Sequence, residues 1–345
     1  MNRVEMILLP AVVLLMSVPA AFSQESAGQS LNIDYKPEIH GTIRAKYEYE
    51  PPIDKGRFEI RNARLSVEGK VIPAVSYKAE IDLSDEGVIK MLDAYVRLKT
   101  SDRLRFTVGQ MRVPFTIDAH RSPHLQYFAN RSFIAKQVGN VRDVGAAVAW
   151  TVGNSFPLTL EGGIFNGSGL TNQKNFWTNN YNFSFKAVGL MAKQFNITLS
   201  CQKAIVGDAD VMMYDAGTYW ENSRWHIEAE YLRKHYSGNR FRSVNAVDVF
   251  AAYRIPFRKG ISALSVLGRY DYMSDHNRGG KDEHGNLTVD DPERHRLTGG
   301  VTLSLGRKSL QADIRLNYEQ YFYASGVVPP VSEQNKIVVE FVAHF

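Results

Sequence analysis

One segment of about 29 residues, from Val113 to Val141, concentrates side chains that can bind anions. Its charged and titratable groups are almost all basic, with Asp118 as the only acid: His120, Arg121, His124, Arg131 and Lys136. The planar guanidinium of Arg donates two hydrogen bonds at once to phosphate or carboxylate. A ring of positive charge in a passage of low dielectric attracts anions and repels cations. The alternative is that these residues cap the segment and pair with acids around it.

Further charges occupy alternate positions in the flanking sequence. In HGTIRAKYEYE (40–50), polar residues alternate with Ile43, Ala45, Tyr47 and Tyr49. A period of two is that of a β-strand with one apolar and one polar face. By this parity, one face carries seven basic residues (Arg44, Lys46, Arg64, Lys70, Lys78, Arg97 and Arg105) and seven acids (Glu48, Glu50, Glu68, Glu80, Asp82, Asp93 and Glu161). Because the signs are mixed, we expect opposite charges to pair across neighbouring strands.

Similar stretches recur to residue 345 and predict about sixteen strands, most of them about ten to twelve residues long, as a tilted membrane-spanning strand requires. The segment 57–72 changes phase near Asn62, which indicates a β-bulge. The predicted strands are 39–50, 57–72, 75–84, 90–99, 103–112, 142–151, 157–166, 181–192, 195–204, 211–220, 223–234, 245–256, 262–273, 295–306, 309–320 and 335–345.

The connections between these strands separate two architectures. Those after even strands are short, such as 73–74 and 193–194, whereas those after odd strands are mostly longer, the third being 113–141. Short turns at one end and long loops at the other are typical of bacterial outer-membrane barrels, and a soluble sandwich has no reason to sort its loops. Aromatic residues near the strand ends agree with interfacial girdles: Tyr47, Tyr49, Trp150, Trp225, Tyr231, Tyr270 and Tyr272.

The N-terminus has the features of an export signal. Arg3 precedes the apolar core Met6–Met16, and Ala21 and Ser23 are small residues suited to cleavage after Ser23. We therefore expect a signal peptide over 1–23, a flexible lead over 24–36 and a barrel over 37–345. Cys201 is the only cysteine, so no disulfide within the chain is expected, and the net charge of +5 is compatible with anionic partners.

Several segments together resemble the family of phosphate-selective porins O and P. They are FEIRNARLSVEGKV, VGQMRVPFT, FANRSF, RDVGAAVAW, GIFNGSG and RYDYMSD, in the order found in that family. The resemblance implies a sixteen-stranded barrel, usually a homotrimer, whose long third extracellular loop folds into the lumen. It also implies a bacterial outer-membrane porin in contact with lipid and lipopolysaccharide.

Together these features predict an all-β transmembrane antiparallel barrel that passes small solutes by diffusion, with a bias toward anions such as phosphate. The candidate residues for solute binding at the constriction and along the lumen are Arg121, Arg131, Lys136, Arg44, Lys46, Lys78, Arg97 and Arg105. The alternatives are a non-conducting adhesin or structural barrel, or an outer-membrane hydrolase. No sequence motif predicts catalysis, a cofactor, a metal site or binding to nucleic acid.

Overall fold

The computed structural model of the chain describes residues 35–85, 87–138, 142–171, 173–192, 194–206, 209–239, 241–257, 261–277, 280–307 and 310–345. The expected signal peptide (1–23) and most of the expected lead (24–36) lie outside these residues. Among the helices of this described part, none has both the length and the apolar character needed to cross a membrane.

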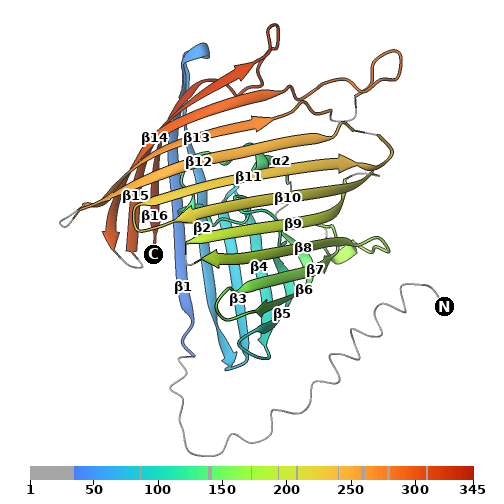
Figure 1. The fold of residues 1–345 in the computed structure, drawn as a ribbon, viewed down its shortest axis with the longest axis vertical. Coiled ribbons are helices and arrows are strands. Elements are labelled where there is room, and N and C mark those ends of the chain that lie inside the picture. Colours follow the sequence, from blue (N-terminus) through green and yellow to red (C-terminus); the bar gives the residue numbers. More distant parts are fainter. Residues whose placement is uncertain are drawn as a thin grey trace, which may run out of the picture. The chain divides into compact units, whose positions relative to one another are not determined.

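Sixteen antiparallel strands form a closed barrel in which each strand pairs with its neighbours in sequence and β1 pairs with β16 (Figure 1). The strands are β1 Glu38–Glu50, β2 Lys55–Ile72, β3 Val75–Asp85, β4 Val88–Lys99, β5 Leu104–Arg112, β6 Arg142–Val152, β7 Leu158–Phe165, β8 Asn182–Ala192, β9 Phe195–Val206, β10 Ala209–Glu221, β11 Trp225–Tyr236, β12 Val244–Pro256, β13 Ile261–Met273, β14 Arg294–Arg307, β15 Leu310–Tyr323 and β16 Lys336–His344.

The barrel confirms the predicted strands, whose ends differ from the observed ones by no more than about three residues. The expected bulge is also present, because the pairing of β1 with β2 skips Arg61, next to Asn62. Connections after even strands are short, the longest within the described segments being 153–157, whereas 113–141, 166–181, 274–293 and 324–335 follow odd strands. The loops are therefore sorted to the two ends of the barrel as the sequence predicted.

The two faces of each strand also follow the predicted parity. In β1, Arg44, Lys46 and Glu48 are buried inside the barrel, while Ile43 points outward and is 49% exposed. Trp150 and Tyr270 are likewise exposed on the outer surface. A closed barrel satisfies its backbone hydrogen bonds without water, and an apolar outer face suits contact with hydrocarbon.

The third loop, residues 113–141, contains two short helices, η2 Pro123–Leu125 and α2 Phe133–Gln137. Apolar residues of this loop pack against inward-facing residues at the long-loop end of β10–β13. Phe133 and Ile134 of α2 are completely buried there, together with Leu232 and Met273 of the wall. This apolar contact covers one side of the barrel interior and fixes the loop against it.

Candidate functional site

Inward-facing residues of β2–β5 carry basic side chains toward the short-turn end of the barrel. The strand register aligns Lys70, Ser76, Arg97 and Thr107 in one row across four strands. Arg97 donates to Thr107 Oγ1 over 3.1 Å and lies 4.9 Å from the centre of the Tyr95 ring. Among the described residues, no carboxylate forms an ion pair with Arg97 or Lys70. The charges of these two cations are therefore not neutralised by a carboxylate of the described residues.

Two cavities follow one another along the inner face of β2 and β3. The first, about 210 Å³, lies beside η2 and is lined by His40, Arg64, Lys78, Glu80, His124 and His344 among others. The second, about 370 Å³, lies at the short-turn end and is strongly basic, with Asp102 as its only acid and five cations: Lys70, Arg97, Lys99, Arg103 and Arg105. Lys78 and Ser76, neighbouring inward positions of β3, line the first and the second cavity respectively.

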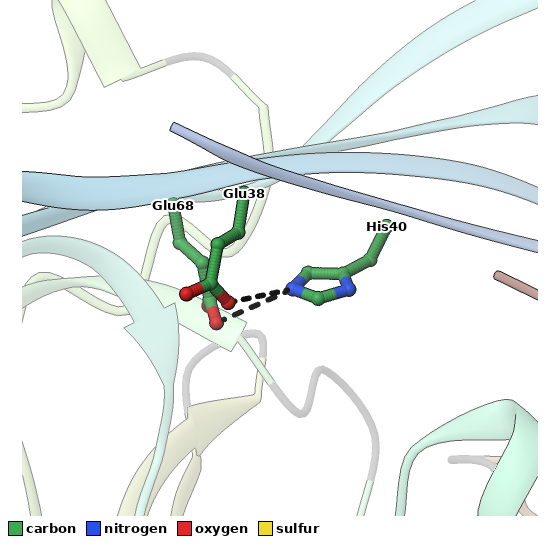
Figure 2. Close-up of side chains that lie close together, drawn as sticks. All are labelled: Glu38, His40 and Glu68. Carbon is green, nitrogen blue, oxygen red and sulfur yellow. Dashed lines mark ion pairs between the residues drawn. The ribbon is translucent and has the colours of Figure 1, made fainter. Parts of the chain in front are cut away.

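At the short-turn end of β1, three side chains meet beside the first cavity. Glu38 and His40 come from β1 and Glu68 comes from β2 (Figure 2). His40 Nε2 lies 3.7 Å from Glu38 and 3.6 Å from Glu68. Glu68 also pairs with Lys78 of β3 over 3.3 Å. Charges of both signs thus border the first cavity, whereas cations predominate in the second.

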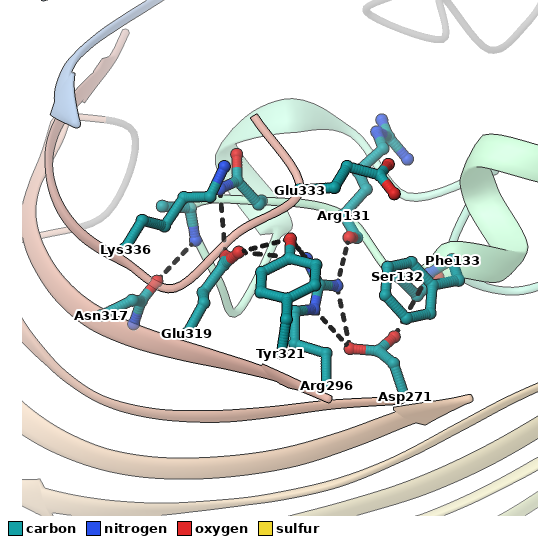
Figure 3. A network of polar contacts seen from close by, with 12 residues as sticks. Arg131, Ser132, Phe133, Asp271, Arg296, Asn317, Glu319, Tyr321, Glu333 and Lys336 are labelled. Carbon is teal, nitrogen blue, oxygen red and sulfur yellow. Dashed lines mark hydrogen bonds and ion pairs between the residues drawn. The ribbon is translucent and has the colours of Figure 1, made fainter. Parts of the chain in front are cut away.

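The third loop is held to the opposite wall by hydrogen bonds that satisfy its backbone. Arg296 of β14 donates to the carbonyl of Arg131 over 2.8 Å and also binds Asp271 and Glu319 (Figure 3). Asp271 in turn accepts from the backbone N–H of Phe133 over 3.2 Å. Cationic side chains thus bind loop carbonyls and acidic ones bind loop N–H groups, so that the polar backbone is paired inside the barrel.

Further contacts of this kind come from strands all around the interior. Arg44 of β1 donates to the carbonyl of Ala129 over 2.8 Å, and Arg315 of β15 to that of His124 over 3.2 Å. On β11, Glu230 accepts from the backbone N–H groups of Ile117 and Asp118. Because the anchoring strands include β1, β11, β13, β14 and β15, the loop lies against the inner wall of the barrel.

The basic residues of the loop itself serve the same anchoring role. Arg121 donates to Asp118 over 3.2 Å and to Glu228 over 2.5 Å, and Arg131 donates to the carbonyls of Asp118 and Arg121 over 2.8 and 3.1 Å. Burial alone would raise the pKa of Asp118, but Arg121 and Arg131 lower it below its ordinary value. Burial lowers the pKa of Arg131 to about 10, so its guanidinium remains charged at neutral pH.

The eight candidate residues therefore separate into two groups. Arg121, Arg131 and Arg44 bind the loop, while Lys46 pairs with Glu48 over 2.7 Å and Lys136 with Glu333 over 2.7 Å. This arrangement agrees with the alternative in which the loop residues cap the segment and pair with acids. The second group, Lys78, Arg97 and Arg105, lines the two cavities.

The sequence did not single out the wall residues that hold the loop. Arg269, Arg296 and Arg315 lie far from the loop in the chain, and their alternation resembles that of any other inward position. The signal present in the sequence was the mixed charge of the inner faces, which predicted pairing across strands. The ion pair between Arg64 and Asp82 of the adjacent strand, 2.9 Å long at Nε, confirms this predicted pairing.

The contact between η2 and β16 predicts a dependence on pH. The rings of His124 and His344 stack with their centres 3.7 Å apart, and Arg112 and Arg315 add positive charge nearby. Burial, followed by these neighbours, lowers the pKa of His124 to about 4. Docking of the loop therefore favours neutral His124. If the loop were released, the pKa of His124 would return to about 6.5. Docking is thus strongest above about pH 6.5 and weakens as the pH falls toward 4.

Single-channel recordings between pH 7 and pH 4 test this expectation. We expect current fluctuations to increase toward pH 4 in the unmodified chain and to change less in His124→Phe, which keeps an aromatic ring but removes the titrating group. An equal increase in both proteins would contradict the assignment to His124.

Comparison with known proteins relates this chain to porins of the outer membrane. Residues 38–193 match the family model described as phosphate-selective porin O and P, which confirms the family resemblance seen in the sequence. No curated protein matches the chain.

Solved structures share the fold at low sequence identity. The outer membrane channel DcaP of Acinetobacter baumannii has a TM-score of 0.60 at 12% identity, covering 90% of this chain and 97% of that chain. The trimer form of OmpT of Vibrio cholerae has a TM-score of 0.58 at 11% identity, and an anion-selective porin from Comamonas acidovorans has 0.58 at 10%. Both comparisons cover 90% of this chain and 99% of the other.

Proposed function

We propose that this chain is an outer-membrane porin for passive diffusion of small solutes, biased toward anions. The premise is that residues 38–193 carry the pattern of the phosphate-selective porin O and P family. The observation that carries the anion bias is the second cavity, in which five cations face one acid, Asp102. Such an excess of positive charge in a confined aqueous space raises the local concentration of anions.

The proposed path runs along β2 and β3, through the first cavity and then the second. Lys78 contributes to the first cavity, and Arg97 and Arg105 to the second. Arg105 is 45% exposed and only loosely paired with Glu161, at 3.7 Å. Solutes bound by such exposed groups exchange quickly with water, which passive diffusion requires. Anionic solutes such as phosphate fit the guanidinium groups, which donate hydrogen bonds in pairs.

The remaining residues of the candidate set serve the path indirectly. Arg121, Arg131, Arg44 and Lys46 hold the third loop or its surroundings in place, and the loop thereby limits the width of the passage. Lys136 pairs with Glu333 near the long-loop end, where its side chain is 39% exposed. We propose that a solute entering from that end passes Lys136 before it reaches the narrow region.

The membrane setting and the assembly belong to the same proposal. The exposed apolar outer face suits outer-membrane lipid, with lipopolysaccharide at the long-loop side. A homotrimer is supported by the structurally similar OmpT of Vibrio cholerae, which is described in a trimer form. Export would rely on a signal peptide over residues 1–23.

Reversal potentials in a salt gradient test the proposed function. The purified protein is inserted into a planar bilayer with potassium chloride at two concentrations, and phosphate is then added on one side. We expect a steady current and a reversal potential displaced toward that of chloride. The absence of a steady current would favour the non-conducting barrel, and a displacement toward potassium would exclude an anion bias.

A further inference from the structure

The cluster of Glu38, His40 and Glu68 has the composition and geometry of a site for a divalent transition metal. Its donor atoms, one from each side chain, all lie within 4.8 Å of one another. His40 points its Nε2 toward both carboxylates from the third position of β1 (Figure 2). The three residues lie on two paired strands, so the hydrogen-bonded register fixes their relative positions.

The register leaves a charge imbalance that a bound cation would relieve. Glu38 lies directly opposite Glu68 in the pairing of β1 with β2, and like charges at opposed positions destabilise a sheet. Lys78, opposite Glu68 on β3, supplies one positive charge over 3.3 Å. The two carboxylates and one ammonium together leave one negative charge at the cluster. A cation bound between Glu38 and Glu68 would offset the repulsion between these two carboxylates, because it attracts both of them.

The distances distinguish between classes of metal. Ligands that surround zinc tetrahedrally at about 2.0–2.1 Å lie about 3.4 Å from one another. The separations from His40 Nε2 to Glu38 and Glu68, 3.7 and 3.6 Å, need only a small closure to reach this value. Ca²⁺ and Mg²⁺ require six or more oxygen ligands and do not favour imidazole. One nitrogen and two carboxylate oxygens are therefore better suited to Zn²⁺.

The surroundings of the cluster favour both access and orientation. The side chain of Glu38 is 73% exposed and that of His40 36% exposed, so a hydrated ion can reach the donor atoms. The second oxygen of Glu68 binds Lys78, which orients the carboxylate toward His40. A fourth ligand position would remain open to water.

We propose that Glu38, His40 and Glu68 form a Zn²⁺ site at the short-turn end of β1, inside the barrel. Glu38 and Glu68 each supply one carboxylate oxygen, and His40 supplies Nε2. The ion would border the first cavity, but metal binding and ion selectivity are measured separately, so the two proposals can fail independently.

Isothermal titration calorimetry with zinc chloride tests the site in the detergent-solubilised, metal-free protein. We expect one Zn²⁺ per chain, and binding at least about 100-fold weaker in His40→Gln and in Glu68→Gln, since loss of a ligand exceeds the 10–100-fold cost of losing an outer-shell partner. His284→Gln, which alters an exposed histidine of the 274–293 connection, serves as the matched control and should bind as the unmodified chain does.

Substitution by Co²⁺ provides a second readout that does not depend on heat. A tetrahedral site with one imidazole and two carboxylates gives visible absorption bands that octahedral Co²⁺ in water lacks. We expect these bands in the unmodified chain and in His284→Gln, and not in His40→Gln. Heat-modified electrophoretic migration checks that each variant is a folded barrel. Unchanged zinc affinity in the His40 and Glu68 variants, or no binding to the unmodified chain, would overturn the proposal.

Discussion

Replacing Arg97 and Arg105 with glutamate is expected to abolish the anion bias of the channel. Both guanidinium groups line the second cavity, and Arg97 has no carboxylate partner among the described residues. A unit charge about 8 Å from a permeating ion changes its energy by about 0.5–1 kcal/mol in a mostly aqueous space. The double replacement changes the cavity charge by four units, because two positive charges become two negative ones.

The measurement is the reversal potential in a gradient of potassium chloride near 0.1 M, where screening extends over about 10 Å. We expect the permeability ratio of chloride to potassium to fall by at least about tenfold and the reversal potential to move close to zero. Arg224→Glu is the control, because Arg224 lies in the 222–224 turn at the same end of the barrel but lines neither cavity. An equal shift in the control would show that the effect comes from general surface charge.

The second large effect is expected from Arg121→Ala, which should weaken the attachment of the third loop to β11. Arg121 pairs with Glu228, whose side chain is fully buried, and stands over the ring of Tyr127 at 5.2 Å. Removing one partner of a buried ion pair costs about 3–5 kcal/mol, because the other charge loses its main compensation. Among the described residues, Glu228 would keep only its contact of 2.9 Å with His226. We therefore expect larger single-channel conductance and more frequent current fluctuations as the loop moves away from the wall.

Lys136→Ala is the matched control for this prediction. It also removes a cation of the third loop, but the Lys136–Glu333 pair is partly exposed to solvent, at 39% and 15%. Exposed ion pairs contribute only about 0–1 kcal/mol. The conductance of Lys136→Ala should remain close to that of the unmodified chain. If Arg121→Ala behaves in the same way, Arg121 does not hold the loop.

The architecture could be predicted from the sequence because alternate residues of a barrel strand face two different environments and differ in polarity accordingly. The stretch 40–50 shows this most clearly, since lipid requires apolar residues such as Ile43 and the interior admits Arg44 and Glu48. Turn lengths then distinguished the two ends of the barrel, and Asn62 correctly marked the change of phase. All of these signals are local, so they can be recognised in the sequence without knowledge of contacts between distant residues.

The arrangement of the interior could not be predicted in the same way. Parity places Arg44 and Arg97 on the same inner surface, yet Arg44 is buried beneath Ala129 of the loop while Arg97 lines a cavity. The difference depends on the path of the third loop, which is determined by residues nearly two hundred positions away, such as Asn317. The metal-binding geometry proposed for Glu38 and Glu68 also could not be predicted from the sequence. It depends on which residues face each other across two strands.

The pairing of β1 with β16 has a consequence for biogenesis. Thr42 meets His344, about three hundred residues later, so this seam joins parts of the chain that are synthesised at opposite ends of translation. Until it closes, both strands present unpaired N–H and C=O groups that readily pair with other chains. In the same unclosed state, Arg315 and Asn317 lack their contacts with the third loop. An unclosed intermediate would therefore be prone to aggregation, and a chaperone that shields its edges would protect the nascent polypeptide.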